Sequence, residues 1–274
     1  MKVRVLTSIG IAIVGIPILI FSGTIVFPIA LALFAFIAAF ELMRVIGVHK
    51  TWFISVPAYL LALALPFGTY FMKDAKQYLL LVALVFFVYL IYLFSVAVFM
   101  RGKLRFADMS EVFATLFYMI ASFTALAILR TLPLGAWMLG FVFMGSWGCD
   151  VFAYFVGSLI GKHKLIPEIS PKKTVEGSVG GIVFATLGFV LLGFIMSKTS
   201  EVNPNYIVIV IAGLLSSIVS QIGDLIASFI KREHGVKDYG KLLPGHGGIM
   251  DRFDSSLAVS TVLMIICLVY NPFI

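Results

Sequence analysis

Four aspartates lie inside or next to long apolar segments in the C-terminal half of the sequence. Asp150 and Asp224 are within such segments, and Asp251 and Asp254 are three residues apart where the last one begins. An ionised carboxylate in hydrocarbon is costly, so these side chains should face a cavity, a cation or a basic partner. Oxygen-only ligands favour magnesium over zinc, and Mg²⁺ typically combines one or two carboxylates with substrate phosphates. The four aspartates are therefore candidate ligands of Mg²⁺, with room for a second cation.

Each aspartate also has a structural alternative. Asp254 can cap the N-terminus of the last helix, and Asp251 can pair with a neighbouring basic residue. Asp224 can form a buried pair with a lysine, and Asp150 can support a ligand or form a hydrogen bond between helices. The residue types alone do not choose between these roles.

Residues 170–174, SPKKT, predict the start of a helix that binds an anion. We place Ser170 as the N-cap and Pro171 as the first helical residue, which leaves free backbone N–H groups at this end. The other side chains that would face the same anion are Lys172, Lys173 and Thr174. This segment is a candidate phosphate site.

A second candidate phosphate site is PGHGG, residues 244–248, together with Arg252. Glycines such as Gly247 and Gly248 allow the backbone to approach a ligand closely, and His246 and Arg252 can donate hydrogen bonds. Basic loops with turn glycines can also be simple topology signals. Topology does not explain the interleaved carboxylates, however, so we favour a site for a phosphate-rich ligand bridged by a divalent metal.

The composition indicates the setting in which these residues must be positioned. Of the 274 residues, 61% are hydrophobic and 12% are charged, and the mean hydropathy is +1.11. These values exclude an ordinary soluble domain and are typical of a polytopic membrane protein. Cys149 and Cys267 lie far apart in apolar runs, so we interpret them as small hydrophobic residues and not as a disulfide or zinc site.

Apolar runs of about twenty residues predict about nine transmembrane helices. They cover residues 5–21, 24–43, 52–72, 78–100, 111–130, 134–160, 176–197, 206–230 and 255–272. We therefore expect an all-α, polytopic integral membrane protein that forms a single membrane-embedded domain over residues 1–274. Residues 1–100 would be a helical scaffold. Residues 134–274 would be the catalytic half, with cytoplasmic loops at 161–177 and 231–254.

The distribution of charge orients the chain. With a cytoplasmic N-terminus, sixteen of the 20 basic residues fall in inner segments, and only Lys73, Lys76, Arg130 and Lys198 fall in outer ones. By the positive-inside rule we expect a multi-pass protein of the cytoplasmic membrane, with its polar loops and active site facing the cytoplasm and its C-terminus outside. A signal peptide is the alternative for the first run, but no clear small-x-small cleavage site follows Ile20. We expect no nucleic-acid partner, because the basic segments are short and lack interleaved aromatic residues.

The segment SFIKREHGVKDYGKLLPGHGGIMDRFD, residues 228–254, resembles the signature of the phosphatidate cytidylyltransferase family, SxxKRxxxxKDxGxxxPGHGGxxDRxD, at every fixed position. Residues 149–165 and 169–177 are similar to the other polar segments of that family, so the likeness covers about the second half of the chain. One departure is Cys149-Asp150-Val151, where smaller or hydroxyl-bearing neighbours of the aspartate are expected.

The resemblance implies a Mg²⁺-dependent enzyme that converts CTP and phosphatidic acid into CDP-diacylglycerol and pyrophosphate. On this basis the expected catalytic residues are Asp224, Asp251, Lys172, Lys173 and Arg252, and the expected cation ligands are Asp150, Asp224, Asp251 and Asp254. The expected substrate-binding residues are Ser170, Lys172, Lys173, Thr174, Lys231, Arg232, Lys237, Asp238, His246, Gly247, Gly248 and Arg252. Glu176 and Asp238 would orient the lysines.

Two other functions fit part of the sequence. A CTP-dependent lipid kinase shares the membrane setting and the nucleotide but transfers the γ-phosphoryl group to an alcohol. An ion-coupled transporter could bind a coupling cation at Asp150 and Asp224, but it leaves PGHGG and the loop arginines unexplained. Small residues such as Gly145 and Gly148 permit close packing of helices, which leaves a homodimer open.

Overall fold

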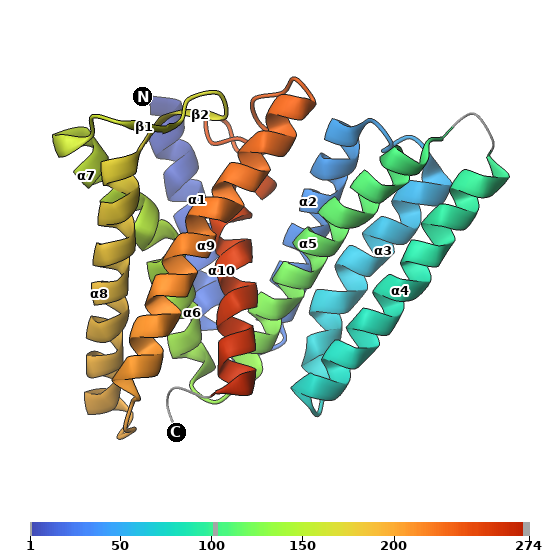
Figure 1. Cartoon of the computed structure of the whole chain (residues 1–274). Helices are drawn as coiled ribbons and strands as arrows, with labels where there is room; N and C mark the ends of the chain where they lie inside the picture. The colour runs from blue at the N-terminus through green and yellow to red at the C-terminus, as the bar shows by residue number, and fades with distance from the viewer. Residues whose placement is uncertain (1, 101–103, 271–274) are drawn as a thin grey trace. The chain divides into compact units, whose positions relative to one another are not determined.

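The chain divides into two compact units (Figure 1). The computed structural model describes residues 2–100 and 104–270, with side chains from residue 6 onward in the first stretch. Unit 1 contains Met1–Thr131 and Asp238–Asp251, and unit 2 contains Leu132–Lys237 and Arg252–Ile274. The signature segment, residues 228–254, thus contributes residues to both units.

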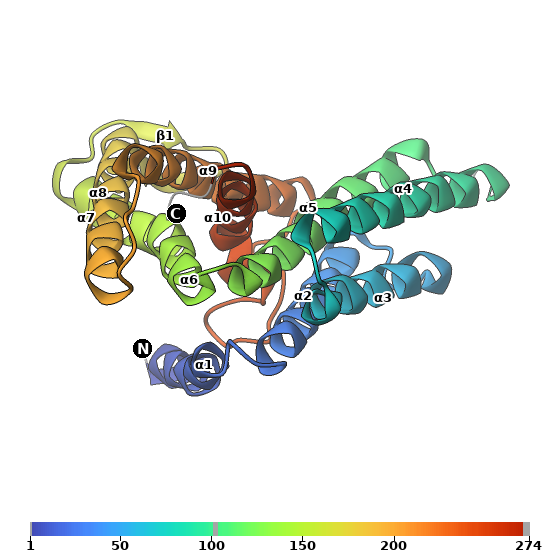
Figure 2. The ribbon, with the colours of Figure 1, turned by 90° about the horizontal axis from the view of Figure 1, so that it is seen from below.

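Unit 1 is helical. Its elements are α1 (Lys2–Ile20), α2 (Val26–Ile46), α3 (Trp52–Gly68), the 3₁₀ turn η1 (Thr69–Phe71), α4 (Ala75–Phe99) and α5 (Phe106–Thr131). α5 packs against α2, α3 and α4 and is buried along most of its length (Figure 2). α4 instead exposes apolar side chains such as Leu80, Leu84 and Phe87. A helix of this composition is suited to contact with lipid tails.

Unit 2 places a short hairpin at one end of a set of packed helices. Its elements are α6 (Gly135–Phe143), the π-helical turn η2 (Met144–Gly148), α7 (Cys149–Ile160), β1 (Lys164–Ile166), β2 (Ser170–Thr174), α8 (Val175–Thr199), α9 (Tyr206–Glu233) and α10 (Met250–Val269) from Arg252 onward. α8 packs against both α7 and α9. The antiparallel strands β1 and β2 lie where α7 ends and α8 begins (Figure 1). The π turn ends two residues before Asp150, and such turns are frequent at functional sites.

The prediction of an all-α polytopic membrane protein is confirmed. All the predicted apolar runs are helical over the described residues, and eight helical segments there are long and apolar enough to cross a membrane. α1 is helical over Lys2–Ile20, and the part of it whose side chains the structure describes, Leu6–Ile20, is apolar. The predicted end of the last run, residues 271–272, lies outside the described residues. The hairpin is an addition that the hydropathy pattern did not predict.

The prediction that Ser170 and Pro171 begin a helix was wrong. SPKKT forms strand β2, and the next helix begins at Val175 with Thr174 as its N-cap. The Thr174 hydroxyl accepts a hydrogen bond from the Gly177 amide at 3.1 Å, which satisfies one of the free N–H groups of the helix start. Threonine, like serine, is a favoured N-cap residue. Pro171 is tolerated because it lies in a strand with one edge unpaired.

Several helix ends differ by a few residues from the hydropathy prediction, and two of these ends flank the signature segment. α9 continues to Glu233 and α10 begins at Met250, whereas the apolar runs predicted boundaries at residues 230 and 255. Polar residues lower the local hydropathy without interrupting the helical hydrogen bonds. Asp224 therefore lies nine residues before the end of α9, about 13 Å along its axis. Asp254 lies in the second turn of α10, so the alternative that it is the N-cap was wrong.

Small residues allow α7 and α8 to pack closely. A Cβ atom added at Gly181 would lie 2.9 Å from the carbonyl oxygen of Cys149 and 2.9 Å from the Cβ of Ala153. One added at Gly177 would lie 2.6 Å from the carbonyl oxygen of Ala153 and 3.0 Å from the Cα of Gly157. Close approach of backbones at small residues is the usual way in which membrane helices associate. This contact fixes the part of α7 that carries Asp150.

We expect Gly181→Leu to destabilise unit 2 by about 1–3 kcal/mol, because the new side chain has no room between α7 and α8. Gly140→Leu is the matched control, since a Cβ atom there meets nothing within 4 Å. The apparent melting temperature of the detergent-purified protein measures the difference. Equal melting temperatures for the two variants would contradict the close packing of α7 and α8.

Candidate active site

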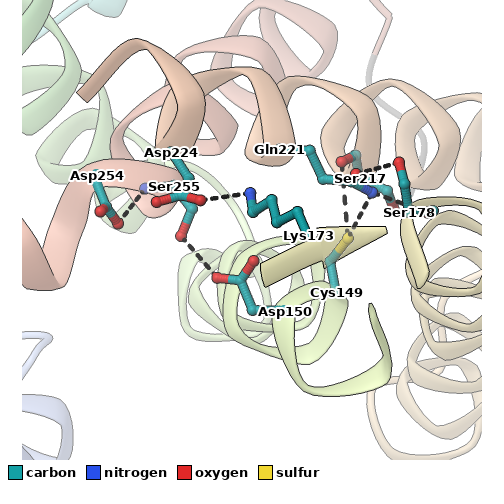
Figure 3. A network of polar contacts seen from close by, with 9 residues as sticks. All are labelled: Cys149, Asp150, Lys173, Ser178, Ser217, Gln221, Asp224, Asp254 and Ser255. Carbon is teal, nitrogen blue, oxygen red and sulfur yellow. Dashed lines mark hydrogen bonds and ion pairs between the residues drawn. The ribbon is translucent and has the colours of Figure 1, made fainter. Parts of the chain in front are cut away.

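Three of the four predicted aspartates meet in unit 2. Asp150 comes from α7, Asp224 from α9 and Asp254 from α10, and Figure 3 shows their carboxylates in one cluster. The charge of Asp254 interacts with those of Asp224 and Asp150, and Asp150 interacts with Asp224. All three side chains are partly buried. Three neighbouring negative charges repel one another, so the cluster requires positive charge nearby.

Lys173 supplies part of that positive charge. Its ammonium group forms an ion pair with Asp224 Oδ2, and the two side chains are 23% and 24% exposed (Figure 3). Successive side chains of a strand point to opposite faces. Lys173 therefore faces the carboxylates from β2, whereas its neighbour Lys172 is exposed. The alternative that Asp224 pairs with a lysine is confirmed, and the partner is one of the two lysines predicted to bind phosphate.

Ser255 connects the other two aspartates. Its hydroxyl lies 3.4 Å from Asp150 Oδ2, and its backbone N–H donates to Asp254 Oδ1 at 2.8 Å (Figure 3). The next residue, Ser256, donates a hydrogen bond to Ser146 in the π turn at 3.0 Å. These polar contacts tie the first turns of α10 to α7 and to the π turn, and so fix the distance between the carboxylates.

A second polar group, beside the cluster, ties α9 to α7 and α8. Gln221 accepts a hydrogen bond from the Ser178 hydroxyl, and its amide nitrogen donates to the Ser178 carbonyl oxygen at 3.0 Å and to Cys149 Sγ at 3.6 Å (Figure 3). The Cys149 thiol lies 3.7 Å from the carbonyl oxygen of Ser217. The Cys149 thiol thus forms polar contacts with both Gln221 and Ser217 of α9.

The donor set of the cluster fits a hard divalent cation. It offers carboxylate oxygens from Asp150, Asp224 and Asp254. The ammonium groups of Lys173 and the buried Lys231 interact with these carboxylates and partly offset their negative charge. Within the described residues, no three Asp, Glu, His or Cys side chains by themselves form a cage for a metal ion. Magnesium typically takes only one or two protein carboxylates and completes its shell with water and substrate phosphates, so its binding here stays a prediction.

The remaining basic candidates of unit 2 differ in exposure. Lys231 is 8% exposed and interacts with Asp254. The side chains that are exposed to solvent are Lys172, Arg232, Lys237 and Arg252. Exposed cations near a cluster of this kind attract a polyanion from water. Their assignment to substrate phosphates stays a prediction.

Glu176 does not contact the lysine pair. It accepts hydrogen bonds from the backbone N–H groups of Lys162 and His163, at 3.0 and 3.2 Å, and its carboxylate lies 2.6 Å from His163 Nδ1. These contacts hold the segment that enters the hairpin. Ser170, at the start of β2, is partly exposed, and Thr174 uses its hydroxyl to cap α8. Glu176 thus positions the hairpin that carries Lys173.

The PGHGG loop and Asp251 belong to unit 1. Asp251 Oδ2 accepts hydrogen bonds from the backbone N–H groups of Tyr239, at 2.8 Å, and Gly248, at 2.9 Å. The Gly248 amide, predicted to line a phosphate, is therefore already used within the loop. Gly245 and Gly247 have φ of 77° and 87°, a conformation that side chains disfavour. The assignment of Asp251 as a cation ligand stays a prediction.

The other predicted residues of this loop are more accessible. Asp238 is exposed, and His246 Nε2 lies 3.3 Å from the Ser8 hydroxyl of α1. Thr7, also in α1, donates a hydrogen bond to the carbonyl oxygen of Pro244 at 2.8 Å. The loop is thus attached to the first helix of the chain.

The sequence model of the Cytidylyltransferase family matches residues 2–270. The chain belongs to the cytidylyltransferase family. Three relatives named phosphatidate cytidylyltransferase illustrate the match. The Staphylococcus epidermidis protein is 34% identical over 268 residues, 97% of this chain and 98% of the relative. The Bacillus subtilis protein is 34% identical over 276 residues, 99% of each chain, and a Staphylococcus aureus protein is 35% identical over 271 residues, 97% of this chain and 98% of the relative.

The predicted family is confirmed, and this cytidylyltransferase is a membrane-embedded nucleotidyltransferase. The match extends over both units, including the N-terminal helices that we predicted to be only a scaffold.

Sequence reasoning missed two residues of this cytidylyltransferase, Glu41 and Arg44. Glu41 is 3% exposed and accepts hydrogen bonds from the backbone of the signature loop, and Arg44 donates another to it. One signal was available, because Glu41 is a carboxylate inside the predicted apolar run 24–43. Such a residue indicates a functional or buried polar contact.

Proposed function

We propose that this membrane cytidylyltransferase transfers the cytidylyl group of CTP to phosphatidic acid, forming CDP-diacylglycerol and pyrophosphate. The observation that carries the proposal is the cluster of Asp150, Asp224 and Asp254 with the ammonium group of Lys173 at one end of the unit 2 helices. Family membership and relatives that bear the name of this activity support the choice of substrates.

The chemistry of the substrates matches a site without a dedicated general base. The phosphomonoester of phosphatidic acid is already an anion near neutral pH, so one of its oxygens can attack the α-phosphorus of CTP directly. The bond between that phosphorus and the oxygen that bridges to the β-phosphate breaks, and this oxygen leaves with pyrophosphate. The protein must therefore align two polyanions and stabilise the charge of the leaving group.

The residues of the unit 2 cluster divide these tasks. Asp224 holds the ammonium group of Lys173 in a defined position, where it would bind a phosphate oxygen. Exposed cations, among them Lys172 and Arg252, would draw the triphosphate in from water. When bound by carboxylates of the cluster, Mg²⁺ would neutralise phosphate charge and stabilise the departing pyrophosphate.

The membrane setting agrees with one lipid substrate and one water-soluble substrate. The cluster is linked to the polar hairpin, because Lys173 of β2 pairs with Asp224 of α9 (Figure 3). Phosphatidic acid can keep its acyl chains among lipids while its headgroup reaches such a position. From the positive-inside rule we infer that the hairpin faces the cytoplasm, where CTP is available.

The position of a label in the lipid product tests the proposal. Purified protein in detergent is incubated with phosphatidic acid, Mg²⁺ and CTP labelled at either the α- or the γ-phosphate. We expect α-label to enter the lipid and γ-label to appear in pyrophosphate. Transfer of γ-label to a lipid would instead indicate a CTP-dependent lipid kinase. If neither label enters lipid, the proposed reaction is contradicted, and cation uptake into vesicles would then test the transporter.

A further inference from the structure

Glu41, near the end of α2, is a buried carboxylate for which the proposed reaction has no role. Its two oxygens accept hydrogen bonds from consecutive backbone N–H groups, Oε1 from Ile249 at 3.1 Å and Oε2 from Met250 at 2.9 Å. These groups belong to the start of α10, where N–H groups have no partners inside the helix. A negative charge there is also favoured by the helix dipole. Glu41 therefore caps α10 from another helix.

The cap extends over three consecutive amides. The Gly248 N–H, immediately before those bound by Glu41, donates to Asp251 Oδ2 at 2.9 Å. Asp251 Oδ2 also accepts the Tyr239 N–H, at the other end of the loop, at 2.8 Å. Two carboxylates thus fix both ends of the segment Tyr239–Met250. The position of the Asp251 carboxylate depends on a loop that Glu41 holds in place.

Two glycines of the signature leave room for the Glu41 side chain. A Cβ atom added at Gly240 would lie 2.0 Å from Glu41 Oε1, and one added at Gly248 would lie 2.2 Å from it. Real Cβ atoms do not approach so closely. Both positions are fixed glycines in the signature pattern, KDxG and PGHGG. The space that these glycines leave open is thus occupied by the Glu41 carboxylate.

Arg44 makes a second contact from the same helix. It follows Glu41 by three residues, so the two side chains lie on one face of α2. Its Nη2 donates a hydrogen bond to the carbonyl oxygen of Tyr239 at 2.6 Å. Tyr239 is therefore held at its N–H by Asp251 and at its carbonyl by Arg44. We call Glu41 and Arg44 the α2 clamp.

We propose that Glu41 is a positioning residue for the transferase reaction: with Arg44, it fixes the loop Tyr239–Met250 and thereby the Asp251 carboxylate. The inference rests on the proposed function, since it assigns the clamp a role in that reaction. A positioning role of the α2 clamp differs from a purely structural role in one respect. Loss of the clamp should change the loop and the catalysis by more than it changes the stability of unit 1.

The test compares Glu41→Gln with Tyr78→Phe. Glutamine has the shape of Glu41 but turns a donor toward one of the two N–H groups, whereas Tyr78→Phe removes a hydrogen bond of 2.6 Å to the Leu65 carbonyl, in the same unit but away from the loop. Hydrogen–deuterium exchange without substrates measures how well the backbone N–H groups of the loop are protected, and kcat/KM for CTP measures catalysis. In Glu41→Gln we expect faster exchange at residues 239–250 and a fall in kcat/KM of about 10- to 100-fold. Tyr78→Phe should change neither.

Arg44→Gln is a second variant in case Glu41→Gln does not fold. Arg44 is exposed, so its loss should leave the fold intact while loosening the loop at Tyr239. Unchanged exchange in the loop, or faster exchange with unchanged kcat/KM, in the folded variants would overturn the inference. If the wild-type protein forms no CDP-diacylglycerol but the exchange responds as expected, the proposed function fails and the clamp itself stands.

Discussion

Replacing Asp224 by Asn should reduce turnover by about 10³-fold or more while the protein remains folded and extractable. The substitution keeps the shape of the side chain but removes the charge that pairs with Lys173 and that would bind a cation together with Asp150 and Asp254. Initial rates of CDP-diacylglycerol formation, measured over a range of Mg²⁺ concentrations, test the expectation.

Asp108→Asn is a suitable control for Asp224→Asn. Asp108 also pairs with a basic residue, Arg105, at 2.9 Å, but this arginine side chain is 84% exposed. Exposed pairs of this kind contribute little to stability. We expect Asp108→Asn to retain the wild-type rate. Full activity in Asp224→Asn would exclude a role for the unit 2 cluster in catalysis.

Replacing Lys173 by Gln should reduce kcat by about 10²-fold or more. Lys173 is the cation of the ion pair, and its loss leaves the repulsion among Asp150, Asp224 and Asp254 without that compensation. Solvent screens part of the interaction between Lys173 and Asp224, because both side chains are about one-quarter exposed. Lys173→Arg should recover part of the activity, since it restores the charge but not the compact ammonium geometry.

Comparing Lys172→Gln with Lys173→Gln tests which of the two adjacent lysines of β2 faces the carboxylate cluster. Lys172 precedes Lys173 in the same strand but is exposed, so its replacement should mainly raise KM for CTP, by less than about tenfold, and weaken the salt dependence. The values of kcat and KM for Lys172→Gln and Lys173→Gln, measured in parallel, test this expectation. A larger loss of kcat for Lys172→Gln than for Lys173→Gln would show that the strand register assigns the wrong lysine to the cluster.

The sequence alone determined the class of the protein and its family. Runs of about twenty apolar residues are a local property, and in a bilayer such a run satisfies its backbone groups as a helix whatever its neighbours are. The signature at residues 228–254 is likewise local. It identified the family correctly. Carboxylates within or next to apolar runs separately pointed to Asp150, Asp224 and Asp254, which the structure brings together in unit 2.

The tertiary structure decided what each polar residue contacts. SPKKT was predicted as a helix start because Ser and Pro favour that position, but the actual cap is Thr174, and pairing with β1 makes the segment a strand. That pairing separates Lys172 from Lys173, which a helical turn would have kept near one anion. A preference of single residues cannot reveal a strand whose partner lies elsewhere in the chain.

Glu41 illustrates the same limit over a longer distance. It binds the amide of Ile249, 208 residues further along the chain, and it explains why positions 240 and 248 must be glycine. From the sequence, Glu41 is one charge in an apolar run, and the glycines are turn residues. Only folding brings them together, because the free N–H groups at the start of α10 require an acceptor and α2 supplies it.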